Sequence, residues 1–172
     1  MAITLNGSSN TITGLADRGI PSTAISAGGL IQTVSTVQSS TVPATSHTAY
    51  TEILSGTITT TVANSKILVS GVIPVYIDNP SSTVWTNAVF VELLEGSSRI
   101  AIYEHPGVQN GGTPGEIAMC IPIQFLTGTK SDATSYTYKF RAKNVGSGDT
   151  AYFGRTTDSS SAWTRMLLQE VS

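Results

Sequence analysis

The sequence predicts an all-β protein, an antiparallel two-sheet β-sandwich of jelly-roll type preceded by an extended N-terminal arm. Three observations support this prediction. Clusters of turn-forming residues recur about every dozen positions. Nowhere do apolar residues keep the i, i+3, i+4, i+7 spacing over the length of a helix. Ser and Thr together make up roughly a quarter of the chain, and the β-branched Thr suits a half-exposed pleated surface.

From Leu30 onward the chain is a succession of strand-like runs separated by turns, which we expect to pair as hairpins. The runs cover residues 30–38, 50–62, 66–77, 84–95, 99–105, 116–126, 135–144, 150–157 and 162–171. The separating stretches include "ANS", "GSS" and the Gly/Pro-rich "PGVQNGGTPG". About eight or nine antiparallel strands suit two packed sheets.

Alternation along a strand predicts which side chains are buried. In "SYTYKFRAKN" the apolar residues from Tyr136 to Ala142 share one side and the Lys and Arg residues share the other. In "RIAIYEH" the same rule puts Ile100 and Ile102 on one face. By contrast, "KILVSGVIPVYI" and "NAVFVELLE" are apolar on both sides, which predicts central strands covered twice. A neighbouring subunit could supply the second cover.

Residues 1–29 form a separate unit, the N-terminal arm, and residues 30–172 form the sandwich domain. In the arm "ITLNGSSNTITGL" alternates like a two-stranded ribbon, and glycines interrupt the rest. Such a ribbon is marginally stable alone, so we expect its apolar residues to dock on another chain. These residues are Ile3, Leu5, Ile12, Leu15, Ile20 and Ile25.

Charge and composition exclude several classes of function. Only 12% of the residues are charged, the net charge is −2, and the nine Lys and Arg are scattered. There is no basic stripe with interleaved aromatics, as nucleic-acid binding requires. We also find no basic, apolar leader and no apolar run of about 18 residues. We therefore expect synthesis in a cytoplasm, without nucleic-acid binding or membrane insertion.

The reactive residue types are few and widely spaced. The single cysteine, Cys120, lies in "EIAMCIPIQF" and is predicted to be a buried structural thiol. His47 and His105 show no metal-ligand spacing. The sequence contains no nucleophile elbow, phosphate-binding loop or zinc-protease motif. A glycosidase pair such as Glu104 with Glu116 stays open on sequence alone, but we expect no enzymatic activity.

Side-chain oxygen atoms in two loops are candidate ligands for a metal ion. Asp78 with Asn79, and Asp149 in "GSGDT", could ligate Ca²⁺. Asx turns account for the same residues, and we expect neither a metal nor a cofactor.

Aromatic residues beside polar loops are the candidates for glycan recognition. Sugars stack on exposed rings and hydrogen-bond to amides and carboxylates. Trp85 near Asp78 and Asn79, or Tyr103 with His105, could supply these groups. The alternative is that the tryptophans close an end of the core or a subunit seam.

Three segments of the chain carry distinctive motifs. "ITLNGSSNTITGLA" precedes a Gly/Pro hinge, and a turn-and-strand step spans Thr60 to Val69. The closing "AWTRMLLQEV" carries Thr164, Met166 and Glu170. With this order and spacing the segments resemble the fibre-tip sandwiches of tail-fibre and virion-surface proteins of tailed bacteriophages.

The resemblance implies a non-catalytic homotrimer at the virion surface, assembled in the host bacterial cytoplasm from this chain and other tail or capsid proteins. A role in host attachment would add a host surface glycan as partner. The chain is short for a complete long fibre and lacks a coiled-coil or β-helical shaft, which leaves a short tail fibre or a capsid decoration (cement) protein. A free-standing, lectin-like carbohydrate-binding module is the alternative.

Overall fold

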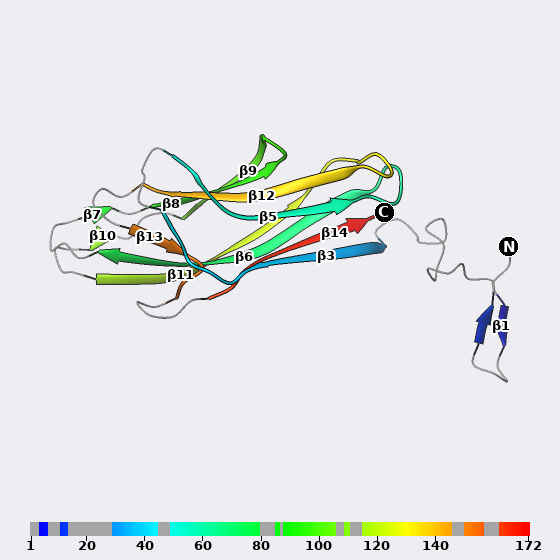
Figure 1. Ribbon diagram of the computed structural model, residues 1–172, viewed down its shortest axis with the longest axis horizontal. Helices are drawn as coiled ribbons and strands as arrows, with labels where there is room; N and C mark the ends of the chain where they lie inside the picture. Colours follow the sequence, from blue (N-terminus) through cyan, green and yellow to red (C-terminus); the bar gives the residue numbers. More distant parts are fainter. Residues whose placement is uncertain are drawn as a thin grey trace.

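The computed structural model describes the backbone of residues 4–6, 11–13, 29–44, 49–79, 85–86, 88–105, 109–110, 115–145, 150–156 and 162–172. Side chains are described for residues 29–43, 49–77, 88–105, 117–145, 150–156 and 162–172. Every regular element in these ranges is a β-strand (Figure 1). In this part of the chain no helix is long and apolar enough to cross a membrane. The all-β prediction is confirmed.

The larger sheet is built around one long strand. Its order is β3-β14-β6-β13-β4, and β11 pairs with the other side of β6. The strands are β3 (Leu30–Gln38), β4 (Val42–Ala44), β6 (Lys66–Asn79), β11 (Gly115–Leu126), β13 (Thr150–Phe153) and β14 (Thr164–Val171). Because β14 pairs with the first half of β6 and β13 with the second half, these two share one position in the sheet.

The smaller sheet has the order β5-β12-β8-β9. Its strands are β5 (Thr51–Thr59), β8 (Val89–Glu95), β9 (Ser98–His105) and β12 (Ser135–Asn144). Figure 1 shows it as a second layer above the larger sheet. Two short two-stranded sheets complete the description: the hairpin of β1 (Thr4–Asn6) with β2 (Thr11–Thr13), and β7 (Trp85–Thr86) with β10 (Gln109–Asn110), which flank β8 and β9 in the chain.

The pairing is that of a jelly roll. If β3 with β4, and β13 with β14, each count as one position, the two main sheets contain eight positions. The first pairs with the eighth (β3–β14, β4–β13) and the second with the seventh (β5–β12). The third pairs with the sixth (β6–β11) and the fourth with the fifth (β8–β9). This nesting is one long hairpin rolled into two sheets, the jelly-roll topology that the sequence predicts.

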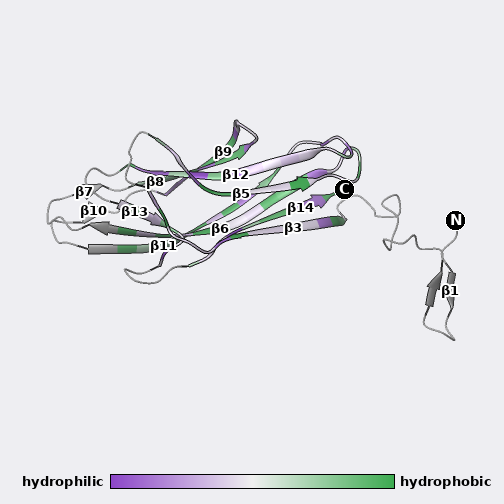
Figure 2. Cartoon of the chain, viewed as in Figure 1, coloured by the Kyte–Doolittle hydropathy of each residue, from purple (hydrophilic) through white to green (hydrophobic). Residues whose placement is uncertain are grey.

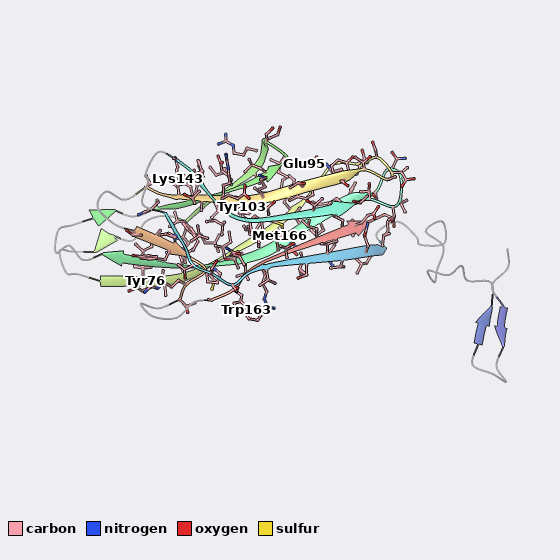
Figure 3. The ribbon with its side chains drawn as sticks, viewed as in Figure 1. Tyr76, Glu95, Tyr103, Lys143, Trp163 and Met166 are labelled. Atoms are coloured by element: carbon pink, nitrogen blue, oxygen red, sulfur yellow. The ribbon has the colours of Figure 1, made fainter. Side chains whose placement is uncertain are left out.

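One hydrophobic core fills the space between the sheets. It takes alternate residues from β6, β8, β12 and β14, and hydrophobic stretches accordingly occur in both layers (Figure 2). Its members include Ile67, Val69, Ile73, Val75, Val91, Leu93, Tyr138, Phe140, Ala142, Met166 and Leu168. Figure 3 shows Met166 between the layers. The predicted inward face of residues 135–144 is thus confirmed.

The prediction that Ile100 and Ile102 share a face is wrong. A register shift between Leu93 and Leu94 pairs Leu93 with Ala101 and Leu94 with Arg99. The shift leaves Ile100 without a direct partner and packs it against the core, whereas Ile102 is 43% exposed. A β-bulge of this kind reverses the alternation beyond it.

A buried carboxylate ties the β5–β6 turn to β14. Glu170 is fully buried, and its carboxylate accepts hydrogen bonds from the backbone N–H of Thr61 (2.9 Å) and of Val62 (3.0 Å). The hydroxyls of Thr61 (3.0 Å) and Ser65 (2.7 Å) and the side-chain amide of Gln32 (2.6 Å) also donate to it. We call this arrangement the Glu170 clamp. It holds the β5–β6 turn, β3 and β14 together at one end of the sandwich.

The hydrogen bonds of the clamp favour the ionised form of Glu170. Burial alone would raise the pKa of this carboxyl, but the donors Ser65, Gln32, Thr61 and Val62 outweigh burial and lower the pKa below 4.5. A carboxyl whose folded-state pKa is lowered stabilises the fold fully above its unfolded-state pKa. That stabilisation is lost as the pH falls through the folded-state pKa.

We predict that Glu170→Gln lowers the free energy of unfolding at pH 7 by about 2–4 kcal/mol, because the new amide NH₂ faces groups that are themselves donors. Urea unfolding measures the effect, and Glu104→Gln, which alters an exposed carboxylate, is the control. The difference between wild type and Glu170→Gln should shrink as the pH falls below about 4.5. Equal stability at pH 7 would contradict the clamp.

Gly71 allows the two sheets to approach each other. A Cβ atom at this position would lie 2.5 Å from the Arg165 carbonyl oxygen and 2.8 Å from two ring atoms of Phe140. Both distances are far below van der Waals contact, and Phe140 is fully buried in the core.

We predict that Gly71→Ala destabilises the fold by about 2–4 kcal/mol, because the ring of Phe140 and the backbone of β14 must both shift. Thermal unfolding measures this loss. Gly128→Ala is the matched control, since nothing lies within 4 Å of a Cβ there. If the two variants melt at the same temperature, the close approach at Gly71 does not limit packing.

Candidate interaction surface

The outward side of the larger sheet is mainly apolar. We define the apolar face by outward residues of β3, β6, β11 and β14 together with the residue before β14. They are Leu30, Ser35, Val37, Leu68, Ser70, Val72, Cys120, Pro122, Gln124, Leu126, Trp163, Arg165 and Leu167. Of the seven exposed large hydrophobic side chains among the described residues, five belong to this set. Figure 3 shows Trp163 on this outer side of the sandwich.

On the apolar face the side chain of Leu167 projects between the short side chains of two serines. Cross-strand pairing aligns Ser35 of β3, Leu167 of β14, Ser70 of β6 and Gln124 of β11 in one row. The short serines leave Leu167 projecting from the face, 38% exposed. Around this row runs a groove of about 470 Å³, whose lining includes both serines, Leu167 and Pro122.

Two cations lie on this side of the sheet: Lys66 in the end row with Val171 and Leu30, and Arg165 nearer the middle. Arg165 has a local partner. The guanidinium of Arg165 lies over the ring of Trp163, 5.4 Å from the ring centroid. A cation on the face of an indole is attracted by the ring quadrupole. The guanidinium of Arg165 is thus directed along β14 toward Trp163.

The outward side of the smaller sheet has the opposite character. Glu92 is 4% exposed although it points outward, because Arg99 (3.1 Å) and Arg141 (2.8 Å) both donate to its carboxylate. Lys143 lies 5.5 Å from the ring centroid of Phe90. These long cationic side chains cover the apolar positions of β8. We call this surface the charged face.

The prediction of a buried Cys120 is wrong. The thiol is exposed, because β11 pairs only with β6 and Cys120 points outward, opposite Pro74. Its neighbour Ile121 points inward and is buried. The apolar run 116–126 therefore has one buried side and one side that no other layer of the described chain covers.

Two of the predicted glycan contacts lie on the strand β9. Tyr103 is half-buried, and its hydroxyl donates to the backbone carbonyl of Gln124 on β11 (2.8 Å). Burial raises the pKa of Tyr103 above its ordinary value of 10.0. Tyr103 thus bridges the edge strands of the two sheets. His105 is half-buried and pairs in register with Val89.

The other sequence candidates are described in part or not at all. Glu104 is exposed on β9, and Glu116 is the second residue of β11 in the other sheet. Leu5 and Ile12 pair in register in the β1–β2 hairpin. The side chains that lie outside the described residues are those of Ile3, Leu5, Ile12, Leu15, Ile20, Ile25, His47, Asp78, Asn79, Trp85, Glu116 and Asp149. The described residues contain no cluster of three or more His, Cys, Asp or Glu suited to a metal ion.

Sequence analysis missed the exposed members of the apolar face. The signal for them is the doubly apolar pattern of residues 66–77 and 116–126, which also fits strands buried on both sides. The sequence marks Glu170 only as part of the closing motif. Its burial and its hydrogen bonds could not be predicted, because its partners in the turn are distant in sequence.

The fold and its surfaces define a class: an eight-position jelly roll with one apolar and one charged outer face. Similar solved structures include a chain of infectious bursal disease virus, Gx strain, at 12% identity and a TM-score of 0.39. This match covers 82% of the present chain and 37% of the viral chain.

A chain of the T13 IBDV viral particle matches at 13% identity and a TM-score of 0.38, over 83% of this chain and 36% of its own. The present chain thus spans little more than a third of either viral chain. No protein-family model and no curated protein matches the sequence.

Proposed function

We propose that this chain is a non-enzymatic structural protein of a bacteriophage virion, built as a homotrimer. In this proposal the N-terminal arm docks the protein on the particle and the sandwich projects from the virion surface. The observation that carries the proposal is the apolar face, because a contiguous exposed apolar surface on a folded domain marks a site of protein association.

The contrast between the two outer faces supports an assembly role. The charged face is saturated by its own ion pairs, such as Glu92 with Arg99 and Arg141, and it suits contact with water. The low charged fraction of 12% leaves few groups whose interactions weaken with salt or change with pH. A protein that must hold together outside a cell benefits from both properties.

The arm supports a docking role. β1 and β2 pair only with each other in the described chain, at three residue pairs. A hairpin this short is marginal without further contacts, and both of its edges can accept another strand. Addition of this hairpin to a sheet of a tail or capsid protein would satisfy its edges and bury Leu5 and Ile12.

The copy number on the particle distinguishes the two forms of the proposal. A short tail fibre would occur as a few trimers at the tail, whereas a capsid decoration protein would occur in large numbers over the shell. Quantitative mass spectrometry of purified particles of the phage that encodes this chain gives this number. Absence of the chain from such particles would refute the proposed function.

We predict that Leu5→Asp or Ile12→Asp reduces incorporation into particles more than about tenfold, because burial of an unpaired charge costs several kcal/mol. Thr4→Asp is the matched control, since it adds the same charge to the opposite face of the same strand. The sandwich should unfold at the same temperature in all three variants. Normal incorporation of the two apolar-site variants would show that the arm does not dock through these residues.

A further inference from the structure

We infer that the groove in the apolar face binds a short, extended peptide segment of a partner protein, in which an acidic residue has an apolar residue two positions away on either side. The acidic side chain pairs with Arg165, and the two apolar side chains cover the walls of the groove. The inference goes beyond the proposed function, because it states the chemistry of a partner segment rather than the place of this chain on a particle.

The size of the apolar face fits a short segment rather than a folded partner. All four strands lie side by side only over Leu68 to Val72 of β6, a length of roughly 17 Å at about 3.3 Å per residue. Four strands about 4.8 Å apart give a width of roughly 19 Å, and thus an area of roughly 320 Å². This is less than half of what each partner buries in an interface of standard size, about 800 Å². An extended peptide of about six residues spans the same width.

Arg165 favours a negative charge on that segment. Its guanidinium stacks on the ring of Trp163, 5.4 Å from the centroid, and stacking leaves the in-plane N–H groups free for a carboxylate. The ion pairs of the described chain use the carboxylates of Glu52, Glu92 and Glu95. None of these pairs involves Arg165, which is exposed and lines the groove. A carboxylate from another chain can therefore form a charge-assisted pair with it.

The place of Arg165 in the sheet sets the spacing within the segment. Cross-strand pairing aligns in one row Val37 of β3, Arg165 of β14, Val72 of β6 and Pro122 of β11. Neighbours in this row lie about 4.8 Å apart, whereas alternate side chains of an extended peptide lie about 6.6 Å apart. A peptide that crosses the strands with its acidic side chain at Arg165 therefore brings one apolar side chain beside Val37. The other lies between Val72 and Pro122.

The neighbouring row supplies hydrogen-bonding groups for a peptide backbone. It contains the hydroxyls of Ser35 and Ser70 and the side-chain amide of Gln124, beside Leu167. None of these three side chains hydrogen-bonds to another described residue. Backbone amides of a bound peptide can pair with them, whereas an acyl chain would leave them unpaired. A glycan would instead place hydroxyl groups against the exposed Leu167.

The test is isothermal titration calorimetry of the full chain with the probe peptide Ser-Ser-Leu-Ser-Glu-Ser-Leu-Ser-Ser. Its ends are acetylated and amidated, so that the glutamate carries the only charge. We expect saturable binding. The same peptide with glutamine in place of glutamate should bind at least about tenfold more weakly, because the charge-assisted pair with Arg165 is lost.

Variants of the chain locate the contact. Arg165→Gln should weaken binding of the glutamate peptide at least about tenfold and leave the glutamine peptide unaffected, a cycle that isolates the pair. Lys66→Gln is the matched control, because it removes the other cation on this side of the sheet, roughly 20 Å along the strands from Arg165. It should leave both affinities unchanged. Circular dichroism verifies that each variant retains its sheet structure.

Three results would overturn the inference. The first is equal binding of the two peptides by the wild type, or no binding of the glutamate peptide at about 1 mM. The second is binding of polygalacturonate without binding of the peptide, which would favour an acidic glycan. The third is a solution mass that falls when the peptide is added, because another copy of this chain would then occupy the groove. The presence of the chain in phage particles tests the proposed function separately.

Discussion

A two-layer sandwich buries the inner faces of its two sheets and leaves two outer faces for solvent or a partner. In this chain one of those outer faces is rich in charged side chains and the other is mainly apolar. On the smaller sheet, arginines pair with the carboxylate of Glu92, and Lys143 lies near the ring of Phe90. The larger sheet presents aliphatic side chains, serines, the stacked Arg165 and, at one end, Lys66. No third layer of the described chain covers this side, and an exposed apolar surface of this kind is typical of sites of protein association.

The interior determines the shape of the apolar face. The Glu170 clamp joins the β5–β6 turn to β14 and β3, and this fixes β14 beside the first half of β6. The bare backbone of Gly71 lets the ring of Phe140 pack closely beneath the same pair of strands. With β14 and β6 in this register, Leu167 lies between Ser35 and Ser70. The projecting residue at the centre of the surface thus follows from contacts in the core.

The sequence predicts those features that depend on local pattern. Turn spacing and a period of two are local, so the all-β class and the inward face of Tyr138 and Phe140 could be predicted. The bulge opposite Ile100 arises in the pairing of two strands, which the alternation of one strand does not report. Cys120 lies in a run that is apolar on both sides, and such a run does not say which side is covered. Glu170 meets the N–H of Val62 across 108 positions of sequence, so its partners emerge only from the fold.

The most direct test of the buried apolar face uses the only cysteine of the chain. Cys120 is exposed in the single chain and lies on β11, the strand at one edge of the apolar face. The measurement is the rate at which Ellman's reagent modifies this thiol in the free folded chain and in the same chain on purified particles. Protection in the assembled protein predicts a rate on the particles at least about tenfold lower than that of the free chain, because access controls thiol reactivity. Equal rates in the two states would contradict burial of the apolar face.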